Sequence, residues 1–581
     1  MFAMIRRLGR CVREYKKPAI LTVLMIVGEA VIEAIVPFVT ADLVNRIETG
    51  IEMRQILLLG VLLFGLAFIS LAFGGAAGYT SSKASAGFAK NLRHDLFEHI
   101  QTFSFANIDK FSSASLVTRM TTDVNHVQMA FMMLTRIAIR APLMILFSIF
   151  MAYKMGGMLA TSFVVLIPVL GFGLYWIAKK AMPAFRSVFK KYDKLNESIE
   201  ENVRAMRVVK GFAREEYEKE KFAVAADDIC RDFTRAERIV AFNMPLMQLC
   251  VYANMVFVLL VGARMVVTTG GSLLQVGQIS AMLTYGMQIL MSLMMLSMIF
   301  VMLTLSAEAA KRIFEVLDEE PTLRQPDDAL FSVADGSIDF ENVSFKYSQK
   351  AKRAALSGIN LHIDSGMTVG ILGGTGTGKS TLVQLIPRLY DATEGTVKVG
   401  GVDVRRYDLD TLRKAVSMVL QKNELFAGTI RENLLWGNPD ATDEEIRQAC
   451  RIAQADEYIS AFPDGYEKMI EQGGTNVSGG QKQRLTIARA LLRKPKVLIL
   501  DDSTSAVDTM TDAKIRQGFR SELPDTTKII IAQRISSVQD ADLIFVLDDG
   551  KIAASGTHDQ LMQSSEIYRE IYTQQTKGGE E

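Results

Sequence analysis

The sequence carries almost no net charge and few cysteines. Its 581 residues include 65 lysines and arginines against 64 aspartates and glutamates, which gives a formal net charge of +1. No bulk electrostatic attraction therefore favours an acidic partner, and we expect no nucleic acid to bind. The four cysteines show neither pairing nor metal-ligand spacing: Cys11, Cys230, Cys250 and Cys450. We interpret them as structural thiols of a reducing compartment.

Apolar residues, by contrast, are abundant. They make up 49% of the chain, and the mean hydropathy is +0.18. A chain of this length is too long for one core, so we expect at least two domains. Because the carboxyl-terminal part is charged and mixed in composition, the excess of apolar residues must lie toward the amino end.

Six apolar runs occupy that part of the chain, at residues 18–44, 56–79, 129–153, 158–178, 242–267 and 279–304. About 20 apolar residues cross a bilayer as a helix, so we predict six membrane spans. The first run is too long for a secretory signal and lacks a small-residue cleavage pattern. Basic residues precede it, at Arg6, Arg7, Arg10, Arg13, Lys16 and Lys17. The positive-inside rule places the amino terminus in the cytoplasm, and an even number of spans returns the chain there.

The connections between the spans are unequal. Those between the second and third and between the fourth and fifth are roughly fifty to sixty residues long, polar and helix-rich, and helices of that length reach well beyond a bilayer. Residues 115–120 and 206–212 are apolar-basic stretches within them, and they are either docking elements for a cytoplasmic domain or solvated loop. We predict a membrane domain at 1–317, a linker at 318–336 and a second domain at 337–581.

The second domain contains a phosphate-binding pattern. An apolar strand at 368–372 precedes a glycine-rich turn of the form G-x-x-x-x-G-K-[ST]. Backbone N–H groups of such a turn close around phosphates, Lys379 adds a positive charge, and Ser380 offers a hydroxyl to Mg²⁺. The predicted phosphate-binding residues are Gly373, Gly374, Thr375, Gly376, Thr377, Gly378, Lys379, Ser380 and Thr381.

Two further motifs complete a nucleotide site. Residues 496–501 read as a buried parallel strand that ends in Asp501, the arrangement that holds Mg²⁺ opposite a phosphate loop. Ser478, Gly479, Gly480 and Gln481 open a helix and so present a second anion-binding helix terminus. One chain therefore carries two phosphate-binding ends.

With these motifs, the chain resembles the ATP-binding cassette (ABC) exporters, specifically the half-transporters with six spans and one nucleotide domain. The resemblance covers nearly the whole chain and includes Gln421 with residues 425–433, the loop 505–508, and Tyr347 where the family stacks an aromatic ring on adenine. It implies a membrane α-helical domain followed by an α/β nucleotide domain, with ATP and Mg²⁺ as cofactors. It assigns Ser380, Gln421 and Asp501 to the metal. It also implies that two nucleotide domains associate head to tail and that coupling helices in the long loops drive alternating access.

Two catalytic positions depart from the family pattern. Asp502 stands where the family has a glutamate that polarises the attacking water, and Gln533 stands where it has a histidine. Gln472 also replaces a glutamate that many exporters carry before the signature. The resemblance therefore implies the degenerate subunit of a heterodimeric, multidrug-type exporter in the cytoplasmic membrane. Its partner is a second half-transporter. A homodimeric lipid or drug flippase and a regulatory or channel-like subunit are the alternatives.

The membrane part gives weaker indications of a substrate. Met287, Met291, Met294 and Met298 share one face of the sixth span, which suits either a cavity for hydrophobic or amphipathic ligands or helix packing. Acidic and basic pairs also lie one helical turn apart inside the first and third spans, namely Glu29 with Glu33 and Arg136 with Arg140. We expect these pairs to neutralise one another, with recognition of cationic amphiphiles as the alternative.

Overall fold

The computed structural model describes residues 2–348, 351–503 and 506–577. Contacts divide the chain into two compact units. The first contains Met1–Gln101 and Ser113–Glu319, and the second contains Thr102–Ser112 and Glu320–Glu581. A short segment of the first long connection therefore packs with the carboxyl-terminal part of the chain.

Long apolar helices build the first unit, in agreement with the six predicted spans. They are α2 (Lys16–Glu48), α3 (Met53–Gln101), α6 (Val124–Gly156), α7 (Thr161–Arg204), α10 (Asn243–Thr269) and α11 (Val276–Leu317). Five continuous helical segments in the described part are long and apolar enough to cross a membrane. One of these, Ser113–Phe185, holds α6 and the first part of α7, because the connection between them is only the 3-10 turn η3 (Gly157–Ala160).

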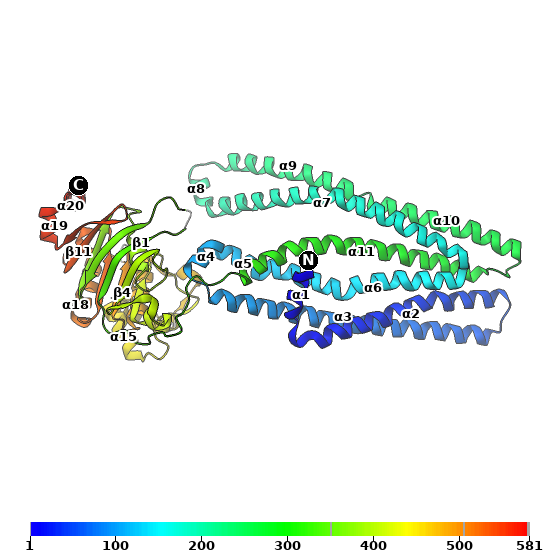
Figure 1. Cartoon of the computed structure of the whole chain (residues 1–581), viewed down its shortest axis with the longest axis horizontal. Coiled ribbons are helices and arrows are strands. Elements are labelled where there is room, and N and C mark those ends of the chain that lie inside the picture. The colour runs from blue at the N-terminus through cyan, green and yellow to red at the C-terminus, as the bar shows by residue number, and fades with distance from the viewer. Residues whose placement is uncertain (1, 349–350, 504–505, 578–581) are drawn as a thin grey trace. The chain divides into compact units, whose positions relative to one another are not determined.

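Several of these helices run far past their apolar runs. α7 extends beside α9 (Glu215–Val240), as Figure 1 shows, and Lys191 joins them through Asp228 at 2.7 Å and Asp232 at 2.8 Å. The remaining elements of this unit are α1 (Phe2–Arg10), η1 (Arg13–Tyr15), α5 (Ser113–Thr118), the π-helical turn η2 (Arg119–Asp123) and α8 (Met206–Gly211).

The second unit contains a mainly parallel sheet beside an antiparallel one. The six-stranded sheet has the order β12-β11-β3-β10-β9-β6, in which β12 alone is antiparallel to its neighbour. Its strands are β3 (Thr368–Gly373), β6 (Val416–Val419), β9 (Val497–Asp501), β10 (Thr527–Ile531), β11 (Leu543–Asp548) and β12 (Lys551–Gly556). The antiparallel sheet comprises β2 (Leu356–Ile363), β1 (Ile338–Phe345), β4 (Glu394–Val399) and β5 (Val402–Asp403), and β7 (Gly428–Thr429) pairs with β8 (Met469–Ile470).

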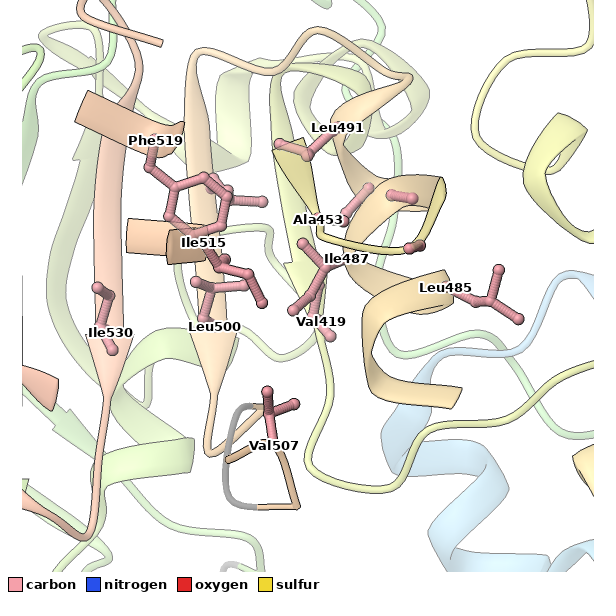
Figure 2. Packing of buried hydrophobic residues seen from close by; sticks show 14 of the residues in the cluster. Val419, Ala453, Leu485, Ile487, Leu491, Leu500, Val507, Ile515, Phe519 and Ile530 are labelled. Atoms are coloured by element: carbon pink, nitrogen blue, oxygen red, sulfur yellow. The ribbon is translucent and has the colours of Figure 1, made fainter. Parts of the chain in front are cut away.

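Helices cover the parallel sheet. β9 and β10 are buried at every position, as expected of strands covered on both faces. Figure 2 shows Leu485, Ile487 and Leu491 of α17 (Gly479–Leu491) with Leu500 of β9 and Phe519 of α18 (Thr509–Glu522) in one cluster. The other helices are α12 (Lys379–Gln384), α13 (Leu409–Ala415), α14 (Ile430–Leu435), α15 (Asp443–Ile452), α16 (Asp456–Ser460), α19 (His558–Ser564), α20 (Glu566–Lys577) and the short 3-10 turns η4 (Val404–Arg406), η5 (Gly465–Glu467), η6 (Gln472–Gly474) and η7 (Ile535–Ser537).

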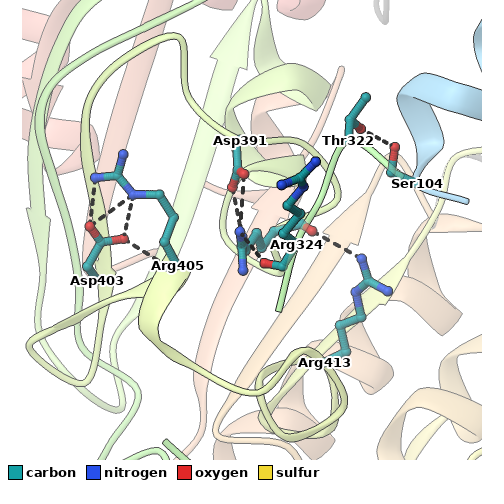
Figure 3. A network of polar contacts seen from close by, with 8 residues as sticks. Ser104, Thr322, Arg324, Asp391, Asp403, Arg405 and Arg413 are labelled. Atoms are coloured by element: carbon teal, nitrogen blue, oxygen red, sulfur yellow. Dashed lines mark hydrogen bonds and ion pairs between the residues drawn. The ribbon is translucent and has the colours of Figure 1, made fainter. Parts of the chain in front are cut away.

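The segment Thr102–Ser112 carries the short helix α4 (Phe105–Phe111), which Ser104 caps. Asn107 donates to the Glu320 carbonyl at 3.0 Å, and Tyr390 donates to Asp109 at 2.7 Å. Figure 3 shows the neighbouring contact between Ser104 and Thr322.

The candidate docking stretches at 115–120 and 206–212 belong to the first unit, and their docking role stays a prediction. The segment Thr102–Ser112, which packs within the second unit, lies just before the first of them. The polar partners that fix it are a capping box and an aspartate, which do not form an apolar-basic pattern.

Candidate nucleotide site

The phosphate loop joins β3 to α12. Gly376 and Gly378 adopt φ values of 81° and 97°, a conformation that glycine adopts readily because it has no Cβ. The Lys379 ammonium donates to the carbonyl oxygens of Gly373 at 2.9 Å and Gly374 at 2.7 Å. Burial lowers the pKa of Lys379, while the charges of Asp501 and Asp502 oppose this shift. The loop thus fixes a positive charge beside the N-terminus of α12.

Ser380 and Asp501 meet at the carboxyl end of the parallel sheet. The Ser380 hydroxyl donates to the Asp501 carboxylate at 3.1 Å. Burial raises the pKa of Asp501, and the Ser380 hydrogen bond opposes that rise. A hydroxyl and a carboxylate on adjacent elements are hard oxygen ligands of the kind that Mg²⁺ prefers, so these residues fit that ion.

The two residues that depart from the family pattern bond to each other. Gln533 Nε2 donates to Asp502 Oδ2 at 2.7 Å, and Gln421 Nε2 lies 3.4 Å from the same oxygen. Burial raises the pKa of Asp502, although both amides favour its charged form. Asp502 has φ 49°, a left-handed conformation that aspartate tolerates better than most residues. Two predicted site residues, Gln533 and Gln421, therefore converge on the carboxylate of a third, Asp502.

The C-terminal helix α20 supports this cluster through a residue that the sequence did not single out. Gln575 Nε2 donates to the Gln533 carbonyl at 2.7 Å, and Gln575 Oε1 accepts from the Ile535 N–H at 2.9 Å. The Gln575 amide thus bonds to the backbone of the residues on each side of Arg534. Gln575 and Gln533 are forty-two positions apart, and no motif marks the contact.

The signature residues form the N-terminus of α17. Ser478 caps the helix, with the Gln481 N–H donating to its hydroxyl at 3.3 Å and the Ser478 N–H donating to Gln481 Oε1 at 3.0 Å. Gln483 Oε1 accepts from the Ala506 N–H at 3.1 Å, so this helix is tied to the loop after β9. In the predicted loop 505–508, Ser505 lies outside the described residues.

Tyr347 lies beside α12, where its ring is 54% exposed. Its hydroxyl is 2.9 Å from the Thr381 hydroxyl. The ring of Tyr390 packs edge-on against that of Tyr347, with centroids 5.4 Å apart. Tyr347 therefore offers an open ring face next to the phosphate loop and contacts the residue that bonds to α4.

The ionisable groups of the membrane unit also come together. Arg140 Nη2 of α6 lies 2.5 Å from Glu33 and 3.7 Å from Glu29, both on α2. Gln288 Nε2 of α11 donates to the Glu33 carbonyl at 3.3 Å, and Gln288 Oε1 accepts from the Ser148 hydroxyl at 3.0 Å. The predicted pairing is confirmed for Glu33 and Arg140.

Comparison with known proteins agrees with this geometry. Residues 19–293 match the ABC transporter transmembrane region, and residues 356–505 match the ABC transporter family model. An uncharacterised ABC transporter ATP-binding protein of Bacillus subtilis (strain 168), YfiB, is 35% identical over 97% of both chains. Another from Mycobacterium tuberculosis (strain H37Rv), Rv1273c, is 34% identical over 99% of this chain and 98% of that protein.

A solved structure shares the fold. A bacterial Atm1-family ABC exporter with ATP bound superposes with a TM-score of 0.83 at 24% identity, covering 97% of this chain and 98% of that one. The exporter-type arrangement predicted from the sequence is therefore confirmed. The chain belongs to the ABC transporter family, as a half-transporter whose nucleotide-binding domain is an ATPase coupled to transport across a membrane.

Proposed function

We propose that this chain is the degenerate-site subunit of a heterodimeric exporter for hydrophobic or amphipathic compounds in the cytoplasmic membrane. Residues 1–317 would form its membrane domain, 318–336 its linker and 337–581 its nucleotide domain. The basic amino-terminal segment supports a cytoplasmic location for both the amino terminus and the nucleotide domain.

The nucleotide site supports binding of ATP with Mg²⁺. The loop N–H groups and Lys379 would hold the phosphates, and Tyr347 would stack on the base. Ser380, Asp501 and Gln421 would supply oxygen ligands to Mg²⁺, which neutralises phosphate charge when bound. In this chain, Ser380 and Asp501 already lie 3.1 Å apart.

One observation carries the assignment of a slow site: the 2.7 Å hydrogen bond from Gln533 to Asp502. An amide donor at this distance competes with an attacking water for Oδ2 and fixes the orientation of the carboxylate. Asp502 is also one methylene shorter than glutamate, and a misplacement of about 1 Å can cost about 100-fold in rate. The aspartate at position 502 and the glutamine at position 533 therefore both reduce the ability of the same carboxylate to polarise water.

The signature helix supports a role in the partner's site. Its cap and its buried face are intact, so Ser478 and the N–H groups of Gly479 and Gly480 remain ordered at a helix terminus. By the head-to-tail arrangement of the family, this terminus would contact the γ-phosphate that the partner chain holds.

A pair of variants in the reconstituted complex tests the asymmetry. A Cβ on Gly480 would lie 2.9 Å from the Ala506 carbonyl, whereas one on Gly479 would lie 3.5 Å from Ala506 Cβ, an ordinary contact. Gly479→Ala thus alters the phosphate-facing surface without an internal clash. The added methyl group would hold the partner's γ-phosphate away from the N–H groups of the helix terminus, so we expect ATP hydrolysis to fall by about 10²- to 10³-fold, the effect of losing a preorganised donor.

Asp502→Asn is the matched change at the other site, and we expect it to alter total hydrolysis by less than about twofold because the slow site contributes little. Equal damage by Asp502→Asn and Gly479→Ala would mean that the two sites are equivalent, as in a homodimer. The heterodimer proposal would then be withdrawn.

The membrane unit supports an apolar or cationic amphipathic substrate. Met287, Met291 and Met298 on α11 are exposed by 51%, 47% and 63%, so flexible thioethers line one open face of this helix. Arg140 bonds Glu33 more closely than Glu29, which leaves Glu29 the freer carboxylate for a cation. Glu29→Gln should reduce transport of cationic but not neutral amphiphiles in proteoliposomes, and equal effects on both would exclude this role.

A further inference from the structure

An apolar cavity lies inside the membrane unit beneath α1. Its volume is about 330 Å³, within the range of small-molecule sites. Four helices form its walls, among them α1 through Leu8 and Gly9, α6 through Phe131 and Ile139, and α11 through Leu303. Phe88 of α3 stacks on Phe131 with centroids 4.7 Å apart, which gives the cavity a flat aromatic wall.

The polar groups in this lining are already satisfied. The Thr135 hydroxyl donates to the Phe131 carbonyl at 3.0 Å, and the Ser306 hydroxyl donates to the His126 carbonyl at 3.1 Å. Water needs two to four polar partners to occupy a cavity, so this one suits a hydrocarbon guest.

The cavity lies where apolar spans give way to polar extensions. On α6 the first lining residue is Val127, and on α11 the last one is Ala310. Both lie close to the ends of the apolar runs, at residues 129 and 304. It therefore opens at the depth where acyl chains meet lipid headgroups.

Helix α1 adds positive charge at this level. Arg6 and Arg10 are exposed, whereas Leu8 and Gly9 of the same helix contribute to the cavity wall. Arg7 forms an ion pair with Asp318, and its guanidinium lies 4.3 Å from the Phe314 ring centroid, so α1 is fastened to the end of α11. Arginines on the polar face of an interfacial helix attract anionic lipids.

We propose that this cavity binds one acyl chain of an anionic phospholipid whose headgroup is held by Arg6 and Arg10. The lining accounts for the hydrocarbon. Arg6 and Arg10, which are exposed and have no ion-pair partner among the described residues, account for the anionic headgroup. The lipid is a resident of the membrane unit, and this assignment does not depend on the identity of the transported compound.

Native mass spectrometry of the full-length transporter tests the site. The protein is purified in detergent and supplied with phosphatidylglycerol or phosphatidylcholine of identical acyl chains. We expect the wild type to retain one phosphatidylglycerol in preference to phosphatidylcholine. Ala307→Phe fills the cavity and should lower the retained fraction about tenfold or more. Arg6→Glu with Arg10→Glu should abolish the headgroup preference without filling the cavity.

Two variants serve as matched controls. Ala67→Phe places the same ring on an exposed position of α3, and Arg54→Glu reverses an exposed charge at the other end of that helix. Both should retain lipid as the wild type does. Unchanged retention in Ala307→Phe, or equal retention of both lipids by the wild type, would overturn the proposal. Retention of free fatty acid as strong as that of phosphatidylglycerol would do the same, since a single-chain anion would then be the ligand.

Discussion

Replacing Asp502 by glutamate and Gln533 by histidine together should raise hydrolysis at this chain's own phosphate loop. The Gln533 amide lies 2.7 Å from the Asp502 carboxylate. A hydrogen bond to a charged group contributes about 1.5–3 kcal/mol, so releasing the carboxylate corresponds to roughly 10- to 150-fold. The added methylene removes a displacement of about 1 Å, which costs about 10² in rate. These are separate contributions of two different changes, so we expect the double variant to raise the rate by about 100-fold or more.

The assay must measure hydrolysis at one site only. In the proposed heterodimer, ATP hydrolysis is therefore measured after the lysine of the partner's phosphate loop has been replaced. Asp525→Glu serves as a control for lengthening an exposed aspartate. Asp502→Glu alone should give a smaller increase, because Gln533 still competes for the carboxylate. A double variant within about twofold of the wild type would refute the argument that these two residues limit the rate.

The pH dependence gives an independent check. Burial raises the pKa of Asp502, and the Gln533 donor opposes that rise. Only the charged carboxylate polarises water, so residual hydrolysis at this site should be lost as the pH falls through that raised pKa. Gln533→Leu removes the donor and should move the acid limb of the pH profile upward. A downward shift would contradict the assigned role of the hydrogen bond.

Three further changes have defined outcomes. Gln575→Glu keeps an acceptor but loses the donor to the Gln533 carbonyl, so it should raise the KM for ATP or alter the pH profile of hydrolysis. Gln574→Ala on the same helix should change neither. Equal effects of the two variants would indicate only that the helix is destabilised. Hydrogen bonds from Lys494, first, and from the backbone and side chain of Thr442 lower the pKa of Glu445 from 4.5 to about 2, so this stabilisation is present above pH 4.5 and lost as the pH falls through 2. Lys494→Gln should therefore shift acid unfolding, followed by circular dichroism, to higher pH, and an unchanged midpoint would exclude the interaction. Tyr347→Ala should weaken ATP binding about tenfold in fluorescence titrations through loss of base stacking, and unchanged affinity would exclude that role.

Local signals in the sequence sufficed for much of the fold and of the phosphate site. The apolar runs predict the long helices because bilayer thickness fixes a minimum length, and the loop before Lys379 is defined by consecutive residues. The choice of Arg140 as the partner of Glu33 was not predictable, since Arg136 has the same spacing pattern. The contact between Gln575 and Gln533 depends on how α20 folds back, which no local pattern encodes.

The packing of residues 102–112 within the second unit was not predictable for a related reason. Ser104 and Asn107 cap a helix of seven residues, a signal that resembles any loop turn until their partners at Glu320 and Thr322 are known. Contacts between residues far apart in the sequence position this segment, and no local sequence pattern encodes them.

Tyr390 connects two parts of the second unit by different forces. Its ring meets Tyr347 edge-on, and its hydroxyl donates to Asp109 of α4 in a part-buried hydrogen bond. Ring contacts carry no net charge, and at 1 M ionic strength the Debye length is only about 3 Å. Concentrated salt should therefore weaken the exposed ion pairs of the chain more than the ring contact between Tyr347 and Tyr390.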